Sequence, residues 1–171
     1  MQLKGYAMYK LIVRAKLRRL YAGVAQGNWQ PIVVNLADTF VYRFIGDTPL
    51  GGTRRTKAAM AAWWTRILTL CPGAALVPQR IVVEGWPWNT TVMTYLHFNA
   101  TIPGEGGVGQ VPYQNEVMQL MQLRWGRITS ILTIEDTQRF ARILPNLAAA
   151  GIAEATAAPI EDADAPMPIA A

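Results

Sequence analysis

The fold is decided by the stretch YQNEVMQLMQLRWGRITSILTIE, residues 113–135. Residues 113–124 and 127–135 are rich in β-branched and other apolar residues that alternate with polar ones, as half-buried strands do. Trp125-Gly126 between them has the length and glycine content of a tight β-hairpin turn. This stretch therefore predicts two long antiparallel strands joined by a two-residue turn.

The position of the turn also predicts which residues face each other. With Leu123 opposite Ile128, Gln119 pairs with Leu132, and one face of the hairpin is mostly apolar with polar residues toward one end. Such a face is typical of a ligand pocket. It comprises Asn115, Val117, Gln119, Met121, Leu123, Ile128, Ser130, Leu132, Ile134 and Asp136. The other face mixes charged residues with Met118, Leu120 and Ile131, which suits a half-exposed or dimer face.

The elements before this hairpin are predicted to be mainly helices first and strands afterwards. This order predicts an α+β domain, in which one strongly bent antiparallel sheet wraps on three helices. Such a cone-shaped α+β barrel has a pocket at its open end. The predicted helices cover residues 7–25 and 29–37, a third begins after an N-cap at Thr53, and a last one covers 137–150; the earlier strands cover 40–45, 75–84 and 90–102.

Length and composition predict one globular domain over residues 1–152, because 51% of the 171 residues are hydrophobic and 16% charged. Residues 153–171 are rich in alanine, proline and acid, and we expect them to be disordered. No apolar signal-peptide segment occurs in Met1–Lys10, so we expect a cytoplasmic protein. The single Cys71 excludes a disulfide framework and a cysteine-ligated zinc site, and the single His97 excludes a histidine-cluster metal centre. We expect neither a metal nor a cofactor.

Positive charge is concentrated in the body of the chain. All 16 Lys and Arg residues precede position 143, and four of the 11 acids follow position 152, so residues 1–152 carry a formal charge of +9. The first six cations are interleaved with apolar residues at helical spacing, which is typical of a helix with a solvated basic side. We therefore expect neither a membrane nor a nucleic acid as partner; binding of RNA, DNA or an anionic membrane stays as the alternative.

Four short pieces of the sequence resemble the SnoaL-like, nuclear transport factor 2-like superfamily over roughly residues 8–150. They are Gln26-Gly27-Asn28-Trp29, Leu36-Ala37-Asp38 before a strand, Gly51-Gly52-Thr53-Arg54 before a helix, and Leu123-Arg124-Trp125-Gly126-Arg127-Ile128 followed by Asp136. This superfamily contains ketosteroid isomerase, limonene epoxide hydrolase and polyketide cyclases, and also non-enzymatic binding and dimerisation domains. The resemblance implies a cone fold with a hydrophobic pocket.

The resemblance carries over few catalytic residues. Arg43 or Phe44 stands where the isomerase has its carboxylate base, and Leu96 and Phe98 stand near the places of the hydrolase residues. Asp136 lies close to the position at which SnoaL-type cyclases carry an aspartate acid/base. The sequence thus leaves open whether the protein is an enzyme.

Three residues are candidates for catalysis, namely Asp136, Tyr42 and His97. Asp136 also fits a helix N-cap, because Thr137 begins a predicted helix. His97 also fits a structural or interface role, and Tyr42 would line the pocket or fill its base. The candidate ligand-binding residues are Asn115, Gln119, Trp63, Trp64, Met121 and Leu132.

Two functions remain in view. The first is a pocket protein with cyclase- or isomerase-type acid/base activity on a small apolar ligand of the polyketide or terpenoid kind. The second is a non-catalytic ligand-binding or dimerisation module. In either case we expect a homodimer through the outer face of the sheet, because an apolar outer stripe is usually buried.

Overall fold

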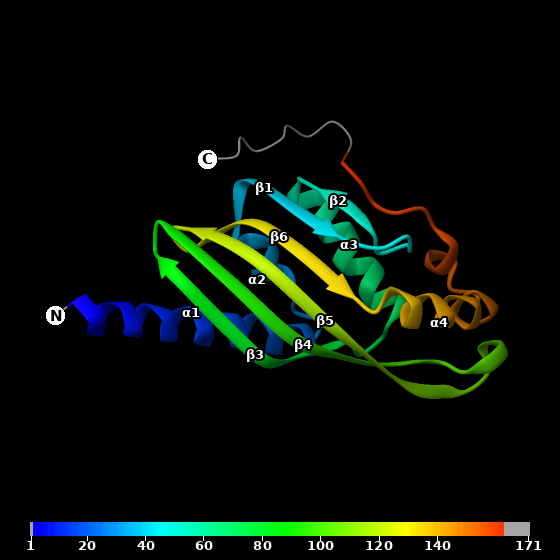
Figure 1. Cartoon of the computed structure of the whole chain (residues 1–171). Helices are drawn as coiled ribbons and strands as arrows, with labels where there is room; N and C mark the ends of the chain where they lie inside the picture. Colours follow the sequence, from blue (N-terminus) through cyan, green and yellow to red (C-terminus); the bar gives the residue numbers. More distant parts are fainter. Residues whose placement is uncertain (1, 163–171) are drawn as a thin grey trace.

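The computed structural model describes residues 2–162 (Figure 1). The elements follow one another as α1 (Gln2–Val24), α2 (Gln30–Val34), β1 (Leu36–Phe44), β2 (Gly52–Arg54), α3 (Lys57–Leu70), β3 (Ala75–Trp86), β4 (Asn89–Pro103), the 3-10 turn η1 (Glu105–Gly107), β5 (Gln110–Arg124), β6 (Arg127–Glu135), α4 (Thr137–Ala149) and the 3-10 turn η2 (Ala153–Thr156). None of the helices in this part of the chain is long and apolar enough to cross a membrane.

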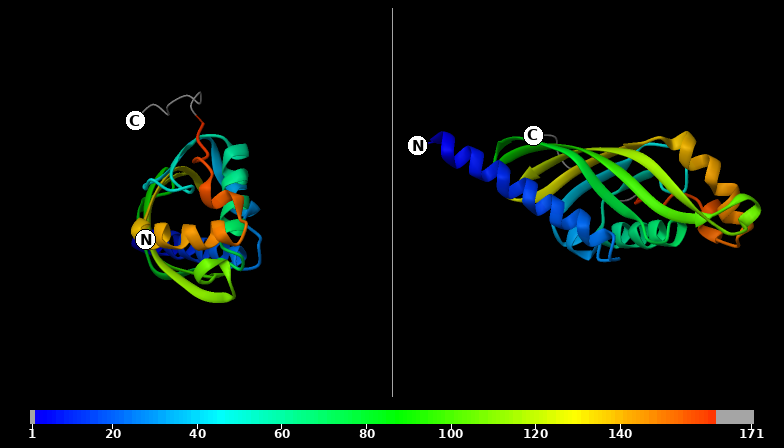
Figure 2. Two further views of the ribbon diagram at one scale, coloured as in Figure 1. Left: turned by 90° about the vertical axis from the view of Figure 1, so that its right-hand side faces the viewer. Right: turned by 90° about the horizontal axis from the view of Figure 1, so that it is seen from below.

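The strands form one six-stranded sheet in the order β2-β1-β6-β5-β4-β3. The sheet is strongly curved and does not close, and the helices cover its concave side (Figure 2). The predicted α+β cone is therefore confirmed. One detail differs from an all-antiparallel sheet, because β1 and β6 run parallel.

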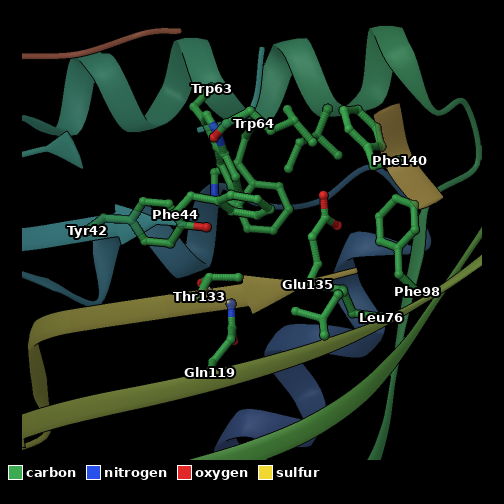
Figure 3. A pocket seen from close by; sticks show the side chains of 13 residues that line it. Tyr42, Phe44, Trp63, Trp64, Leu76, Phe98, Gln119, Thr133, Glu135 and Phe140 are labelled. Carbon is green, nitrogen blue, oxygen red and sulfur yellow. Dashed lines mark hydrogen bonds between the residues drawn. The ribbon is translucent and has the colours of Figure 1, made fainter. Parts of the chain in front are cut away.

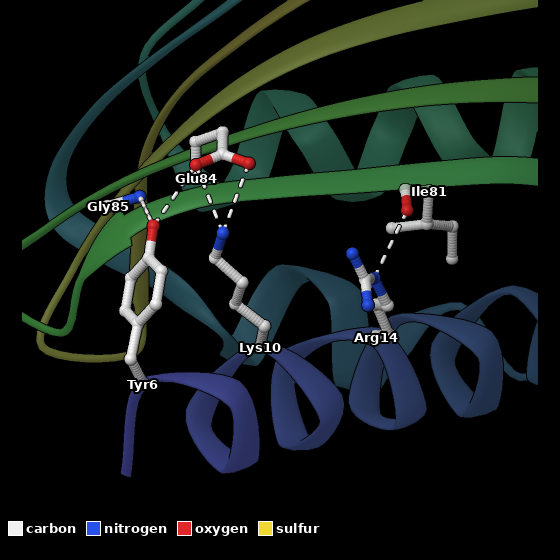
Figure 4. A network of polar contacts seen from close by, with 6 residues as sticks. All are labelled: Tyr6, Lys10, Arg14, Ile81, Glu84 and Gly85. Carbon is white, nitrogen blue, oxygen red and sulfur yellow. Dashed lines mark hydrogen bonds and ion pairs between the residues drawn. The ribbon is translucent and has the colours of Figure 1, made fainter. Parts of the chain in front are cut away.

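Helix α1 lies along β3 and is held there in two ways. Val13, Leu17 and Val24 are buried at helical spacing, so one side of the helix contributes to the core. On the flank, Lys10 Nζ forms an ion pair with Glu84 at 3.0 Å, and Arg14 Nε donates to the carbonyl oxygen of Ile81 (Figure 4). Part of the predicted solvated basic side therefore contacts the sheet.

The predicted hairpin turn is confirmed. Arg124 pairs with Arg127, and Trp125 and Gly126 adopt φ values of 50° and 76°. Positive φ at both central residues defines a type I′ turn, whose twist matches that of the strands.

The predicted register of the hairpin, however, is wrong beyond the first pair. Leu123 does lie opposite Ile128, but the next pair is Gln122 with Ser130, so Thr129 is one extra residue in β6. This β-bulge moves each later residue of β6 to the opposite face. Gln119 therefore pairs with Thr133 instead of Leu132, and Val117 with Glu135 instead of Ile134. The inner face of β6 now carries Ile131, Thr133 and Glu135, and the outer face carries Ser130, Leu132 and Ile134.

Helix α3 begins three residues later than predicted. Residues 52–54 pair with β1 as strand β2, which uses the backbone of Thr53. The N-cap is Thr56 instead of Thr53, and its side-chain oxygen accepts a hydrogen bond from Ala59 N at 3.2 Å.

Residues 153–162, which were expected to be disordered, pack against the body of the protein. Ala155 is buried, and Ile160 packs against the core. The Asp162 carboxylate accepts hydrogen bonds from the backbone of Arg55 and Thr56 at the start of α3, each at 2.8 Å. Composition does not predict this packing, because small alanine side chains fit closely against the helices and backbone groups of the body of the protein supply the hydrogen-bond donors. The rest of the predicted tail, 163–171, lies outside the described residues.

We expect Asp162→Ala to lower the free energy of unfolding at pH 7 by about 1–2 kcal/mol, because it removes a carboxylate that caps α3. Partial burial raises the pKa of Asp162, but the hydrogen bonds from Arg55 and Thr56 lower it by a larger amount, so the net shift is downward. The stabilisation should therefore vanish as the pH falls below the usual aspartate range. Chemical denaturation at pH 7 and pH 3 measures this. Glu154→Ala is the control, and equal losses in both variants would contradict the capping role.

Candidate functional site

A pocket lies between the concave face of the sheet, α3 and α4 (Figure 3). Its walls are mainly aromatic and aliphatic, with a few polar groups on the sheet side. Its free volume is about 30 Å³, which is room for about two water molecules. The lining residues are Tyr42, Phe44, Leu50, Trp63, Trp64, Ile67, Leu76, Phe98, Val117, Gln119, Thr133, Glu135 and Phe140.

One wall is a cluster of aromatic rings from α3 and β1. The ring of Trp63 lies 4.8 Å from that of Tyr42 and 5.3 Å from that of Trp64. Trp63 is held in place because its Nε1 donates to Leu50 O at 2.9 Å. The indole nitrogen of Trp64 and the hydroxyl of Tyr42 are buried, and neither makes a regular hydrogen bond within the described residues. Because both residues line the pocket, their donors are candidates for contact with a bound ligand.

A buried cation lies behind this wall. The side chain of Arg54 is fully buried, and its guanidinium donates to the carbonyl oxygen of Leu50 at 2.9 Å and to that of Gly51. It lies 5.1 Å from the centre of the Trp63 ring, a cation–π distance. Burial lowers the pKa of Arg54 to about 10, so the charge persists at neutral pH. Arg54 shapes the loop that positions Trp63.

Polar side chains of α1, β5 and β6 form a chain of hydrogen bonds on the concave side of the sheet. Tyr21 of α1 donates to Gln119 Oε1 at 2.8 Å, and Gln119 Nε2 donates to Thr133 Oγ1 at 3.2 Å. Because both ends of the Gln119 amide are bonded, its orientation is determined before any ligand binds.

The acid in the pocket is Glu135, the last residue of β6. Asn115 Nδ2 donates to its Oε2 at 3.3 Å, whereas Oε1 is buried and has no partner among residues 2–162. Burial raises the pKa of Glu135 to about 8, the charge of Asp136 raises it as well, and the Asn115 hydrogen bond opposes the shift. The carboxyl group is thus largely protonated at pH 7, yet it can lose its proton within one pH unit.

Asp136, the first catalytic candidate, lies outside the pocket. It is exposed, and its Oδ1 accepts a hydrogen bond from Arg139 N at 2.9 Å as the N-cap of α4. This is the alternative role predicted for it. Asn115, expected opposite Asp136, donates from Nδ2 to the backbone carbonyl oxygen of Asp136 at 3.1 Å and also to the Glu135 carboxylate.

The structure brings together only some of the other predicted site residues. Tyr42, Gln119, Trp63 and Trp64 line the pocket. Met121 is buried on the same face of β5, beyond the lining residues. Leu132 faces outward because of the bulge at Thr129. His97 is half-buried away from the pocket, with Nε2 3.2 Å from the Tyr95 hydroxyl.

Glu135 is not among the predicted site residues, because the predicted register places it on the outer face of the hairpin. One signal could have found it. Asp136-Thr137 has the pattern of a helix N-cap, and an aspartate that caps a helix cannot also point into the pocket. The neighbouring acid is then the only carboxylate left at the end of β6. Within the described part of the chain, no three His, Cys, Asp or Glu side chains are grouped to hold a metal ion.

Residues 17–131 match the model of the SnoaL-like domain. The match covers more than half of the chain, so this protein belongs to the SnoaL-like domain family, as the four sequence pieces predicted. No curated protein matches the chain at a significant level.

Solved structures with the same fold agree with this assignment. IdmH, described as a putative polyketide cyclase from Streptomyces antibioticus, is 21% identical with a TM-score of 0.59, over 82% of this chain and 99% of its own. TerC, co-crystallised with polyporic acid, is 20% identical with a TM-score of 0.61, over 76% and 95%. An NTF2-like protein of unknown function from Burkholderia pseudomallei is 15% identical with a TM-score of 0.63, over 76% and 95%. At these identities the likeness shows the fold alone.

We expect Glu135→Gln to stabilise the protein at alkaline pH and to leave it nearly unchanged at pH 5. The folded protein keeps the Glu135 proton up to about pH 8, whereas the unfolded chain loses it near pH 4.5. Wild type should therefore lose stability as the pH rises between these values, on the order of 4–5 kcal/mol. Gln is neutral throughout and should not show this loss.

Denaturation of both proteins from pH 5 to pH 9 measures the difference. Burial raises the pKa of Tyr42, Tyr113 and Cys71 above this range, so these neighbours stay neutral. Parallel stability curves for wild type and Glu135→Gln would contradict the raised pKa.

Proposed function

We propose that this protein binds a small, mainly apolar carbonyl compound in the cone pocket and moves a proton of that compound by means of Glu135. The observation that carries the proposal is the buried carboxyl group, with one free oxygen, in an aromatic pocket. The family supports a reaction of the cyclase or isomerase type. A polyketide-like compound is supported by IdmH, described as a putative polyketide cyclase, and by TerC, co-crystallised with polyporic acid.

The chemistry assigns one role to each polar group. In its ionised form Glu135 removes a proton from the carbon next to the carbonyl. The electron pair of the C–H bond then forms a C=C bond, and the π pair of the carbonyl moves onto its oxygen, which gives an enolate. Tyr42 and Trp64 have free donors that can stabilise the enolate. In an isomerisation, Glu135 then returns the proton to another carbon. In a cyclisation, the enolate carbon attacks a second carbonyl, whose π pair moves onto its oxygen, and Glu135 gives its proton to that oxygen. Asn115 holds Oε2 during both steps.

Ligand binding requires the pocket to widen. Pockets that hold small molecules measure about 300 Å³ or more, and the free volume here is about 30 Å³. Trp63 is anchored to Leu50 O. The indole nitrogen of Trp64 has no such anchor, and Phe98 is half-exposed. We expect these two side chains to move when a ligand enters.

The adjacent acids provide a matched pair of variants. We expect Glu135→Gln to lower turnover about 10²-fold or more while ligand binding persists, because Gln cannot accept the proton. Asp136→Asn should retain turnover and melting temperature, since Asn caps a helix nearly as well. Wild-type turnover should rise with pH toward a plateau above pH 8, because the ionised form of Glu135 is the base.

The measurement begins with a thermal-shift screen of hydrophobic ketones, lactones and polyenes, followed by turnover assays on each compound that binds. A Glu135→Gln variant with wild-type turnover would overturn the catalytic proposal. Binding of these compounds without any turnover would favour a non-catalytic ligand-binding module.

A second candidate function, dimerisation, is favoured by the outer face of the sheet. Met93 lies opposite Leu120, and Met118 lies opposite Ile134. All four side chains are exposed, so they form one apolar strip across β4, β5 and β6. We propose that a second copy of the chain covers this strip, because monomers rarely expose contiguous apolar surface.

We expect light scattering at micromolar concentration to give the mass of a dimer. Met118→Lys/Leu120→Lys should give a monomer with an unchanged circular dichroism spectrum, because two like-charged pairs would face each other in the dimer. Val34→Lys places the same charge on an exposed apolar residue of α2 and should remain a dimer. A wild-type monomer would contradict the proposal.

A further inference from the structure

Three tryptophans that the pocket does not use gather at one end of the molecule. Trp86 and Trp88 lie at the β3–β4 turn and Trp125 at the β5–β6 turn, with 38%, 51% and 73% of their surfaces exposed. The rings of Trp86 and Trp88 stack at 5.5 Å, and Trp88 lies 6.1 Å from Trp125. Trp125 N donates to Pro87 O at 2.5 Å, so the two turns are joined.

Helix α1 extends this aromatic cluster. Its first turns project past the sheet (Figure 2, right). Met8, Leu11 and Ile12 are 56–58% exposed and, at spacings of three and four residues, share one side of the helix. The ring of Tyr6 lies 4.8 Å from that of Trp86, so the helix and the turns form one surface. We call residues 2–16, 84–89 and 124–127 the hairpin end.

An apolar groove runs along the hairpin end between α1 and the β5–β6 turn. Its volume is about 160 Å³, larger than that of the cone pocket. Tyr9, Ile12, Leu17 and Leu20 line it from α1, and Leu123 and Ile128 line it from the hairpin. Lys16 lies at this groove, with its Nζ 3.4 Å from Gly126 O. The groove therefore combines a mainly apolar lining with one cation.

The hairpin end is strongly positive. Its three segments contain six Lys or Arg residues and one acid, Glu84, which is paired with Lys10. Arg124 and Arg127 flank the turn that carries Trp125. Exposed tryptophans, an apolar helix side and surrounding cations together characterise proteins that lie on a bilayer surface.

We propose that the hairpin end binds the surface of an anionic membrane. Trp88 and Trp125 enter the headgroup layer, Met8, Leu11 and Ile12 contact acyl chains, and the cations contact lipid phosphates. A second copy of this chain is disfavoured as the occupant, because a two-fold contact would bring the six cations of each copy together. Nucleic acid would leave the exposed aliphatic side chains without a partner. The proposal is independent of Glu135 and the pocket.

The test is sedimentation of the full chain with vesicles. One set contains phosphatidylcholine alone, and the other contains about one third phosphatidylserine. We expect binding to the anionic vesicles only, and weaker binding when salt rises from about 50 to 500 mM. Trp88→Ser/Trp125→Asn should lower the affinity about tenfold or more; Asn suits the positive φ of position 125. Arg124→Gln should lower it about fivefold.

Two variants at other exposed positions serve as controls. Val108→Ser removes a highly exposed apolar side chain from the loop after η1, and Arg142→Gln removes an exposed cation from α4. Both should bind vesicles as wild type does. Melting temperatures establish that each variant is folded.

Several results would overturn the proposal. These are absence of binding to anionic vesicles, equal binding to both vesicle sets, or equal losses in the tryptophan variant and in Val108→Ser. A change in molecular mass in the tryptophan variant would show that the hairpin end joins protein copies instead. The hairpin end would be assigned to nucleic acid if random RNA displaced the protein completely from the vesicles and the tryptophan variant no longer bound RNA.

Discussion

The position of one extra residue in β6, Thr129, determines which side chains face the pocket. The hydroxyl of Thr129 donates to Gln122 O at 3.2 Å, and beyond this bulge each inward position of β6 is one residue later than regular pairing would give. The side-chain period of a strand is two, so this shift exchanges the two faces. Glu135 enters the cone, Leu132 and Ile134 face outward, and Asp136 becomes the N-cap of α4.

The raised pKa of Glu135 lowers the free energy of unfolding at neutral pH. An acid with a pKa of about 8 is neutral in the folded protein at the pH where the unfolded chain would be ionised. The chain thereby loses stability at neutral pH and retains a group that exchanges its proton there. Asp136, one peptide bond away, faces solvent and caps a helix. Two adjacent carboxyl groups thus lie in different environments, one in the pocket and one in solvent, because the end of a strand turns them in opposite directions.

The curved sheet separates two surfaces with different chemistry. The pocket lies near α4, where β6 ends, and the hairpin end lies where β6 begins (Figure 1). Helix α1 takes part in both, since Tyr21 orients Gln119 and Tyr6 contacts Trp86. Residues 153–162 pack beside α3, the helix that carries Trp63 and Trp64, and Asp162 accepts hydrogen bonds from Arg55 N and Thr56 N at the start of that helix. Substitutions in α1 or in residues 153–162 should therefore affect the pocket indirectly, through Gln119 or through α3.

The sequence by itself determined the cone fold, the hairpin turn and the family, because Trp125-Gly126, the alternating strands and the helical spacings are local patterns. It also placed Tyr42, Gln119, Trp63 and Trp64 on elements that the structure brings to the pocket. Only the tertiary structure decided between Asp136 and Glu135. The spacing of Ile128, Ile131 and Leu132 allows either face of β6 to turn toward the core. The bulge at Thr129 selects the inward face, and it forms where β6 pairs with both β5 and β1. The gathering of Trp86, Trp88 and Trp125 likewise arises from turns distant in the sequence, which no local pattern brings together.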